Sequence, residues 1–342
     1  MNQVERLFGD RIVFPGLGID ISVDNEAFSL FGLSIKWYGV VIALGMLLAM
    51  IYCFRRTKEF GIDGDRLTDA VFAGLVGAVI GARLYYVALH AESFHDIKEI
   101  IAIRDGGLAI YGGIIGALLF GCITAKIRKL RILPTLDIAS MGFFIGQALG
   151  RWGNFFNQEA FGCNTTLPWG MSGSRIQQYL INHQASLAAQ GMEIDPYLPV
   201  HPCFLYESLW CLAGFLVLHF YQKHRKFDGE LFCIYVLWYG TGRAFIEGLR
   251  TDSLYIGSVR ASQMLAIISA IAALAVIIIM RIRIKKKGAF VLYRDTEESK
   301  AILEATANAE KEEAERRKAK KHKELSAEQR IISDDDEDEE QK

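Results

Sequence analysis

Seven long apolar stretches constrain the fold of this chain more than any other feature. A helix needs about 20 mainly apolar residues to cross roughly 30 Å of hydrocarbon. Three stretches meet this requirement with no charged residue inside them, at 37–54, 106–125 and 261–280. Four more are apolar but carry one or two charges, at 70–91, 132–150, 200–222 and 231–249. The sequence therefore predicts an all-α integral membrane protein with seven transmembrane helices.

Basic residues mark every second connection between these stretches. The basic clusters follow the first, third, fifth and seventh stretches: Arg55, Arg56 and Lys58; Lys126, Arg128, Lys129 and Arg131; Lys223, Arg225 and Lys226; Arg281, Arg283 and Lys285 to Lys287. Cytoplasmic loops carry such an excess of Lys and Arg. The pattern predicts an outside N-terminus and a cytoplasmic C-terminus. It also places the long connection 151–199 outside, as a small extracytoplasmic head with a short helix at 176–189.

The charge is concentrated at the C-terminal end of the chain. Residues 282–342 hold 15 Lys or Arg and 17 Asp or Glu, whereas 51% of the whole chain is hydrophobic. We therefore expect an extracytoplasmic N-terminal segment (1–34), a membrane domain (35–282) and a charged cytoplasmic tail (283–342). The tail is predicted to be helical over 296–330 and disordered in the acidic run 334–340. This composition excludes a wholly soluble globule, and the six cysteines form no metal-binding pattern.

Ionisable residues inside the apolar stretches are candidates for function, because each is expensive at bilayer depth. Arg83, Asp137 and Glu207 are single charges, for which a structural and a functional role are equally plausible. The sixth stretch and the residues after it carry a larger group. Its members Tyr239, Arg243, Glu247 and Arg250 share one helical face. Arg243 and Glu247 can pair, which leaves a surplus positive charge and predicts binding of a phosphate or carboxylate.

A second polar group lies at the end of the fourth stretch, in residues 150–162. Arg151, Asn154 and Gln158 are expected on one helical face with Glu159 alongside, and aromatic residues alternate with them. Polar donors next to aromatic rings suit an amphiphile with a polar head group.

These residues carry a resemblance to a known family. The run Gly-Arg-x-Gly-Asn-Phe-Phe-Asn-x-Glu-x-x-Gly from Gly150 to Gly162 resembles the signature of the prolipoprotein diacylglyceryl transferases. Further matching pieces occur in order over about residues 30–282: Trp37-Tyr38-Gly39, Gly81-Ala82-Arg83, the glycine-rich run 105–116, His201-Pro202, Leu205-Tyr206-Glu207, and Gly242-Arg243 with Glu247 and Arg250. The tail lies outside the resemblance.

The resemblance implies an activity and its partners. The family transfers the sn-1,2-diacylglyceryl group of phosphatidylglycerol to the lipobox cysteine of a prolipoprotein, which forms a thioether and releases glycerol phosphate. The implied location is the bacterial cell membrane, with no cofactor, metal or nucleic acid involved. The implied catalytic residues are Arg151, Arg243, Glu159, Tyr111 and Glu247. The implied residues for phosphatidylglycerol binding are Arg151, Asn154, Arg243, Tyr38, Arg83, Asn157, His201, Glu207 and Arg250.

One position departs from the common family pattern. Family members often have His where this chain has Tyr111, although Tyr also occurs there. With a pKa near ~10, Tyr is mostly a proton donor at neutral pH, so the identity of the base stays open. An anion transporter and a membrane scaffold or receptor are the alternatives. The absence of an internal repeat disfavours the first, and the polar cluster disfavours the second.

Overall fold

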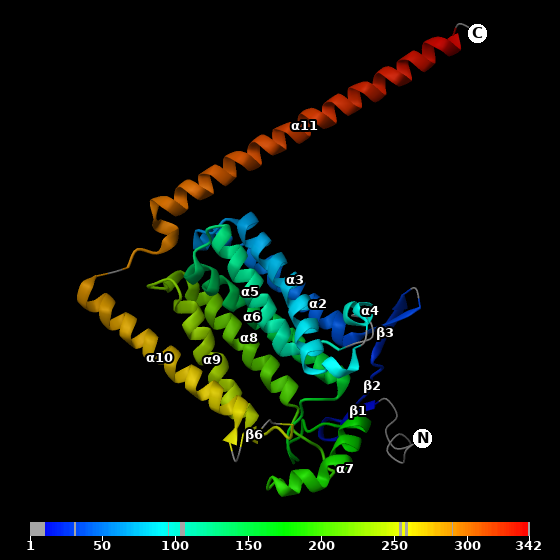
Figure 1. The fold of residues 1–342 in the computed structure, drawn as a ribbon, viewed down its shortest axis with the longest axis vertical. Helices are drawn as coiled ribbons and strands as arrows, with labels where there is room; N and C mark the ends of the chain where they lie inside the picture. The colour runs from blue at the N-terminus through cyan, green and yellow to red at the C-terminus, as the bar shows by residue number, and fades with distance from the viewer. Residues whose placement is uncertain are drawn as a thin grey trace. The chain divides into compact units, whose positions relative to one another are not determined.

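The computed structural model describes residues 11–30, 32–94, 96–102, 107–252, 255–256, 259–288 and 290–340. These residues divide into two compact units (Figure 1). The first unit comprises Met1–Thr57 and Arg131–Leu292, and the second comprises Lys58–Leu130 and Tyr293–Lys342. Each unit is built mainly from helices, with little sheet.

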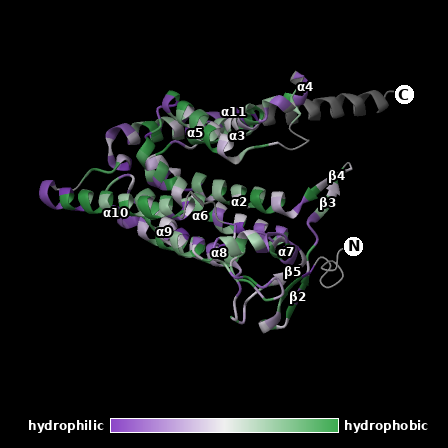
Figure 2. Cartoon of the chain, turned by 60° about the horizontal axis from the view of Figure 1, so that its bottom comes forward, coloured by the Kyte–Doolittle hydropathy of each residue, from purple (hydrophilic) through white to green (hydrophobic). Residues whose placement is uncertain are grey.

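Each of the seven predicted stretches is a helix. In chain order they are α2 (Trp37–Phe54), α3 (Gly64–Leu89), α5 (Ile110–Ile127), α6 (Ile132–Asn157), α8 (Cys203–Tyr221), α9 (Glu230–Glu247) and α10 (Ala261–Lys287). Among the described residues, α2, α3, α6, α8 and α10 are long and apolar enough to cross a membrane. The 18-residue α9 carries Glu230, Arg243 and Glu247, and α5 is a shorter apolar helix. Figure 2 shows hydrophobic residues along most of α10 and hydrophilic residues at its lysine-rich end.

Helices of the first unit pack in the order α2, α6, α8, α9, α10. Two tryptophans join α8 to α9. The indole N–H of Trp210 donates to the backbone carbonyl of Trp238, and the indole N–H of Trp238 donates to the backbone carbonyl of Trp210, both at 2.9 Å. Gly242 lies against this pair: a Cβ added there would lie 2.1 Å from the Trp210 indole nitrogen. A side chain at position 242 would therefore separate the two helices.

Asp137 has a structural role at the start of α9. Its carboxylate is fully buried and accepts hydrogen bonds from the backbone N–H groups of Gly229 (2.7 Å) and Phe232 (3.0 Å). These N–H groups have no partner inside their own helix. The carboxylate of α6 therefore caps α9, and of the two readings of this residue the structure supports the structural one.

The head combines the predicted helix with strands that the sequence did not predict. α7 (Ser174–Ala189) begins two residues before the predicted start, and β5 (Ser172–Gly173) pairs with β1 (Arg11–Phe14) of the N-terminal segment. The remaining strands are β2 (Ile19–Ser22), β3 (Glu26–Leu30), β4 (Leu33–Lys36), β6 (Tyr255–Ile256) and β7 (Val259–Arg260). The three-stranded sheet has the order β2-β1-β5. A core of buried residues, among them Ile12, Met171 and Phe204, fills the space beneath this sheet.

The second unit contains a closely packed helix pair, α3 and α5, and the short helix α4 (Ile97–Ile101). Four glycines form the contact between α3 and α5. A Cβ at Gly81 would lie 2.3 Å from the Gly112 carbonyl oxygen, and a Cβ at Gly77 would lie 2.5 Å from that of Gly116. Small residues allow this close approach, which is common between helices in membranes.

The tail helix α11 (Glu297–Glu340) also belongs to the second unit and follows the short turn η6 (Tyr293–Asp295). Its first ten residues are attached to the unit. The Ser299 hydroxyl donates to the Gly61 carbonyl at 3.0 Å, and Thr306 donates to the Asp63 carboxylate. Residues 308–319 are all exposed. α11 covers nearly all of residues 296–330, where a tail helix is predicted, and it continues through the acidic run 334–340, for which disorder is predicted.

The other short turns complete the described chain. They are η1 (Pro15–Leu17), η2 (Thr57–Phe60), η3 (Ala91–Ser93) and η5 (Gln222–His224).

Candidate functional site

The polar motif at residues 150–162 is only partly helical. α6 ends at Asn157, and Gln158 takes the left-handed conformation with φ 54°. Gln158 therefore does not share a helical face with Arg151 and Asn154, and this expectation was wrong. The Gln158 side chain is buried and accepts a hydrogen bond from the backbone N–H of Arg175 at 3.1 Å, which ties the end of α6 to the start of α7.

Glu207 of α8 is the centre of an arginine cluster. One oxygen of its carboxylate lies 2.6 Å from Arg151 of α6. The other oxygen lies 2.8 Å from Arg243 of α9 and 3.3 Å from Arg250, which follows that helix. The Glu207 side chain is only 4% exposed, whereas Arg151 is the most exposed of the three arginines at 21%. Three segments far apart in the sequence thus converge on one buried carboxylate.

Two further carboxylates balance the charge of this cluster. Glu247 contacts Arg243 at 2.5 Å, and Asp252 makes a two-pronged contact with Arg250 at 2.8 and 2.7 Å. Three guanidinium groups therefore face three carboxylates, and a fourth, that of Arg260, donates to the backbone carbonyl of Glu247. Glu207 and Asp252, which the sequence argument left out, offset much of the positive charge expected at the end of α9. An anion here would meet arginine N–H donors whose charge is largely compensated.

Arg151 has the most unused donor capacity. A guanidinium has five N–H donors, and the contact with Glu207 uses one terminal nitrogen of Arg151. Within the part of the chain that the structure describes, the other N–H groups of Arg151 have no partner. Arg forks match the oxygens of phosphate groups, so Arg151 is the arginine best placed to take up an oxyanion.

Two amides and one carboxylate extend the site beyond Arg151. Asn154 and Asn157 both donate to the same oxygen of Glu159, at 2.9 and 3.1 Å, and Glu159 is exposed. Glu159 therefore holds the amides in place. Among the residues that the structure describes, this arrangement leaves each amide carbonyl oxygen and the second Glu159 oxygen open to a ligand.

The N-terminal turn of α2 packs against the motif. The Tyr38 ring lies over Gly153, where an added Cβ would approach it to 2.7 Å, and Trp37 stacks on Phe156 with centroids 5.3 Å apart. Tyr38 is 39% exposed. Because Gly153 lies between Arg151 and Asn154 in the chain, the predicted site residue Tyr38 lies beside the motif.

A short antiparallel ladder joins the motif to the ends of α8 and α9. The N–H of Gly162 donates to the His201 carbonyl at 2.9 Å, and the N–H of Cys163 donates to the Leu249 carbonyl at 2.8 Å. Gly162 also forms a bridge with Arg250. These backbone contacts fix His201 and Arg250 beside the motif, which the sequence spacing alone could not reveal.

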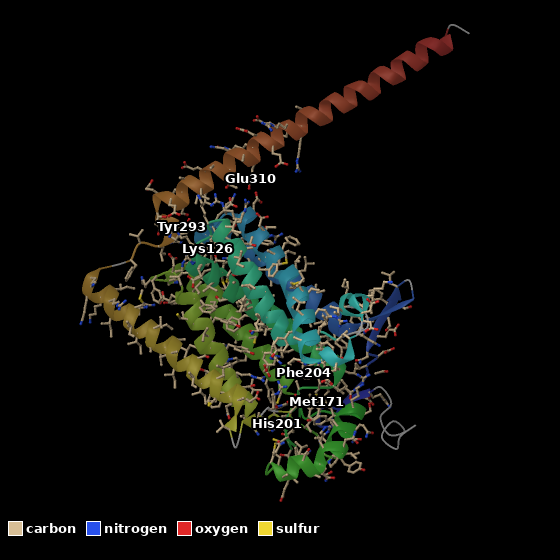
Figure 3. All side chains as sticks on the ribbon, viewed as in Figure 1. Lys126, Met171, His201, Phe204, Tyr293 and Glu310 are labelled. Carbon is tan, nitrogen blue, oxygen red and sulfur yellow. The ribbon has the colours of Figure 1, made fainter. Side chains whose placement is uncertain are left out.

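His201 belongs to a hydrogen-bonded row of rings. Its Nδ1 lies 3.1 Å from the Tyr206 hydroxyl, which accepts a bond of 2.8 Å from the Trp169 indole. Burial lowers the pKa of His201, which favours the neutral ring. Figure 3 labels His201 near the core residues Met171 and Phe204. Trp169, Tyr206 and Asp252 were not assigned to the site from the sequence. Of these three residues, only Tyr206 could have been identified from the sequence, because it stands in the matching piece Leu205-Tyr206-Glu207.

Two of the predicted site residues, Arg83 and Tyr111, lie in the second unit. Arg83 is 7% exposed and donates to four backbone carbonyls, those of Glu99 (2.7 Å), Ile100 (2.8 Å), Ala102 (3.1 Å) and Gly107 (2.9 Å). These bonds indicate that Arg83 orders the connection between α3 and α5. Tyr111 lies in the first turn of α5 and is 62% exposed. Lipid binding by Arg83 and catalysis by Tyr111 stay predictions.

Fold and site together define a helical membrane protein with a buried cluster of arginines and carboxylates that adjoins the polar motif 150–162. Residues 25–279 match the model of the family described as "Prolipoprotein diacylglyceryl transferase". The chain belongs to this family.

Relatives from three bacteria carry the name phosphatidylglycerol–prolipoprotein diacylglyceryl transferase. The chain is 39% identical over 265 residues to that of Clostridium novyi, which covers 77% of this chain and 98% of the relative. It is 40% identical over 267 residues to that of Finegoldia magna (78% and 97%) and 35% identical over 289 residues to that of Thermotoga maritima (81% and 91%). The tail lies outside the family match.

Proposed function

We propose that this protein transfers the diacylglyceryl group of phosphatidylglycerol to the lipobox cysteine of prolipoproteins, releasing glycerol phosphate. The observation that carries the proposal is the Arg151–Glu207–Arg243 cluster, formed by the motif of this family. The names of the relatives support the same donor and acceptor.

The arginines bind the phosphate of the donor lipid in this proposal. A phosphodiester carries one negative charge, and the departing phosphomonoester can acquire a second. Arg151 and Arg243 donate to the phosphate oxygens on which this charge grows, which stabilises the transition state. Glu207 and Glu247 hold the guanidinium groups in place. Arg250 and His201 complete the wall of the site.

The remaining predicted residues serve the lipid and the thiol. Asn154, Asn157 and Glu159 bind the glycerol head group through their oxygens, and Tyr38 packs beside it. The acceptor cysteine, with a usual pKa of about 8.5, must lose its proton, and an adjacent arginine guanidinium favours the thiolate. The proposal also keeps two roles that the resemblance to the family implies: catalysis through the Tyr111 hydroxyl, and binding of phosphatidylglycerol by Arg83.

The proposal includes a membrane topology. All seven apolar helices span the bacterial cell membrane, with the N-terminus and the head outside and the tail in the cytoplasm. The alternating basic connections support this orientation. Glu230, Arg243 and Glu247 in α9 are tolerated because each is paired: Glu230 contacts Arg281 at 2.6 Å, and Arg243 contacts Glu247.

The experiment is transfer by the purified full-length protein. The protein is incubated with vesicles containing phosphatidylglycerol and a lipobox peptide, and the peptide mass is measured. We expect a mass increase of one diacylglyceryl group. Matched controls use vesicles of phosphatidylethanolamine alone and a peptide with serine in place of cysteine. An unchanged peptide mass with the cysteine peptide and phosphatidylglycerol would refute the proposal.

A further inference from the structure

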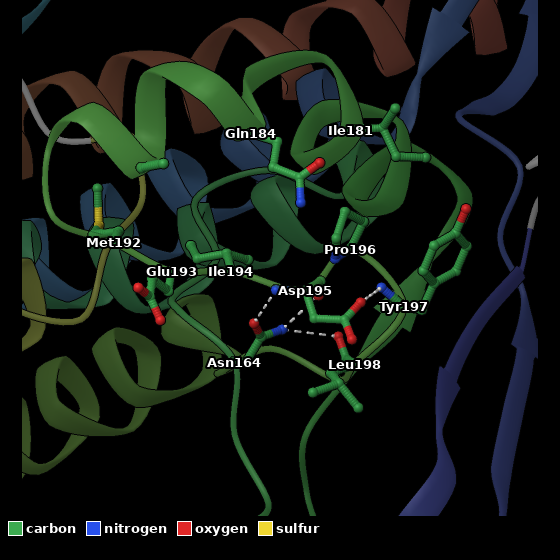
Figure 4. Close-up of a pocket in the computed structure, with 11 residues that line it drawn as sticks. Asn164, Ile181, Gln184, Met192, Glu193, Ile194, Asp195, Pro196, Tyr197 and Leu198 are labelled. Atoms are coloured by element: carbon green, nitrogen blue, oxygen red, sulfur yellow. Dashed lines mark hydrogen bonds between the residues drawn. The ribbon is translucent and has the colours of Figure 1, made fainter.

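A pocket in the head lies beside the site and has no part in the chemistry proposed above. It has a volume of about 800 Å³ and is formed by α7 and residues 192–198 (Figure 4). Its apolar lining includes Ile181, Tyr197 and Leu198, and its polar lining includes Gln184 and Glu193. Tyr197 is 64% exposed and Leu198 is 52% exposed. Large apolar side chains gathered at a pocket on the surface are typical of a binding site.

The pocket is held open by one asparagine. Asn164 donates to the carbonyls of Asp195 (2.9 Å) and Leu198 (3.2 Å), and its carbonyl oxygen accepts from the N–H of Asp195 at 2.8 Å. The Asp195 carboxylate in turn accepts from the N–H of Tyr197 at 2.8 Å. Figure 4 shows these bonds as dashed lines among Asn164, Asp195, Tyr197 and Leu198. The loop is therefore shaped before any ligand arrives, which reduces the entropy lost on binding.

Two chain segments lead from this pocket to the arginine cluster. Asn164 pairs with Val200 in an antiparallel bridge, and two residues earlier Gly162 pairs with Arg250 and bonds to His201. At about 3.3 Å per extended residue, these two or three residues span roughly 7–10 Å. An extended polypeptide that runs alongside these segments from the backbone of Arg250 would reach Asn164, at the edge of the pocket, after about three residues.

We propose that this pocket binds the polypeptide segment that follows the acceptor cysteine, at about the third to sixth residue. The inference rests on the proposed function, because that reaction requires a polypeptide acceptor. The pocket suits an extended chain: apolar walls accept its side chains, and Gln184 can pair with its backbone. Among the described residues, the lining includes Glu193 and Asp195 and no basic residue, so the pocket favours basic over acidic residues in the bound segment.

The charge of the lining argues against insertion of this surface into the bilayer. The donor lipid phosphatidylglycerol is anionic, and a surface rich in this lipid repels carboxylates. Tyr197 and Leu198 would otherwise be reasonable membrane anchors. Glu193 and Asp195 beside them make a peptide the better occupant, and the following experiment separates the two.

The test compares two peptides with the same lipobox, one ending at the second residue after the cysteine and one at the tenth. We expect the long peptide to have a KM about tenfold lower, the effect of one or two apolar contacts. Tyr197→Ser and Leu198→Ser should raise the KM of the long peptide about tenfold and leave that of the short peptide unchanged. Leu17→Ser is the matched control, because Leu17 is 51% exposed elsewhere.

Charge provides an independent arm of the test. Lysine at the fourth and fifth residues of the long peptide should lower its KM relative to glutamate, and Glu193→Lys should reverse this order. Equal KM values for the long and short peptides with the unmodified protein would overturn the inference. So would an equal loss on both peptides in Tyr197→Ser and Leu198→Ser, the result expected if these residues contact lipid. Absence of transfer to either peptide would instead refute the proposed function.

Discussion

Replacing Glu207 by glutamine is the most direct test of the arginine cluster. The Glu207→Gln side chain has nearly the same size and keeps one carbonyl oxygen, so packing around α8 should persist. Its charge is lost, and its new NH₂ group points donors at guanidinium groups that are donors themselves. The three arginines would then face only two carboxylates, Glu247 and Asp252.

The magnitude follows from the burial and contacts of Glu207. The residue is 3% exposed and contacts Arg151, Arg243 and Arg250 at 2.6, 2.8 and 3.3 Å. Removing one partner of a buried ion pair costs about 3–5 kcal/mol. If half or more of this cost appears in the transition state, the rate falls by at least tenfold to a hundredfold, at ~1.36 kcal/mol per decade.

The assay is kcat/KM for transfer to a lipobox peptide, with thermal unfolding in detergent to verify the fold. Asp252→Asn is the matched control, because Asp252 is 34% exposed and contacts only Arg250 among these arginines. The Asp252→Asn protein should lose at most about threefold in kcat/KM, because a partly exposed ion pair contributes little. A folded Glu207→Gln protein with a kcat/KM near that of the unmodified protein would refute the view that Glu207 organises the site.

Four further predictions follow from other contacts. Arg243→Lys should lower transfer at least about a hundredfold, because Lys cannot contact two carboxylates and a phosphate through one planar fork; near-normal kcat/KM in the folded variant would count against it. Gly242→Ala should lower the unfolding temperature by displacing the Trp210 indole, whereas Gly146→Ala, with nothing within 4 Å, should not. Truncation after Lys287 should leave the chemistry intact but lower stability by about 1–3 kcal/mol, through two lost hydrogen bonds; truncation after residue 319 keeps both bonds and should be neutral. Burial lowers the pKa of His201 in the folded protein, so the unfolded chain binds a proton on this ring more readily. The free energy of unfolding should therefore be unaffected by His201 above pH ~6.5 and should decrease below it. His201→Gln should weaken this decrease in a pH series of unfolding midpoints.

The helices of the membrane domain could be predicted because their signal is local. Residues 37–54 were predicted as a span, and α2 has the same bounds. Apolar length alone determines such a helix. α6 shows the limit of this signal: the apolar stretch ended at residue 150, the polar motif after it was expected to be helical through Gln158, and the helix in fact ends at Asn157. Those residues remain helical because their partners, such as Glu207, come from elsewhere in the chain.

The strands and the charge balance could not be predicted for a related reason. β1 pairs with β5 through Ile12 and Gly173, about 160 residues apart, and neither short strand has an alternating pattern of its own. Asp252 was missed because it stands outside the apolar stretch, although its contact with Arg250 spans only two residues. The sequence identified the arginines, but their partners depend on a fold that brings α6, α8 and α9 together.

The balance of charges explains how three arginines can lie among apolar helices and still recognise a lipid phosphate. A site with surplus positive charge would pay a large desolvation cost before the lipid arrived, and a tightly bound phosphate product would leave slowly. Here Glu207, Glu247 and Asp252 offset the charges of Arg151, Arg243 and Arg250 in the resting protein. Because Arg151 keeps N–H donors in reserve, the phosphate is held by directed hydrogen bonds. These bonds strengthen as charge grows on the departing phosphate, so the same arginines bind the substrate moderately and its transition state more tightly.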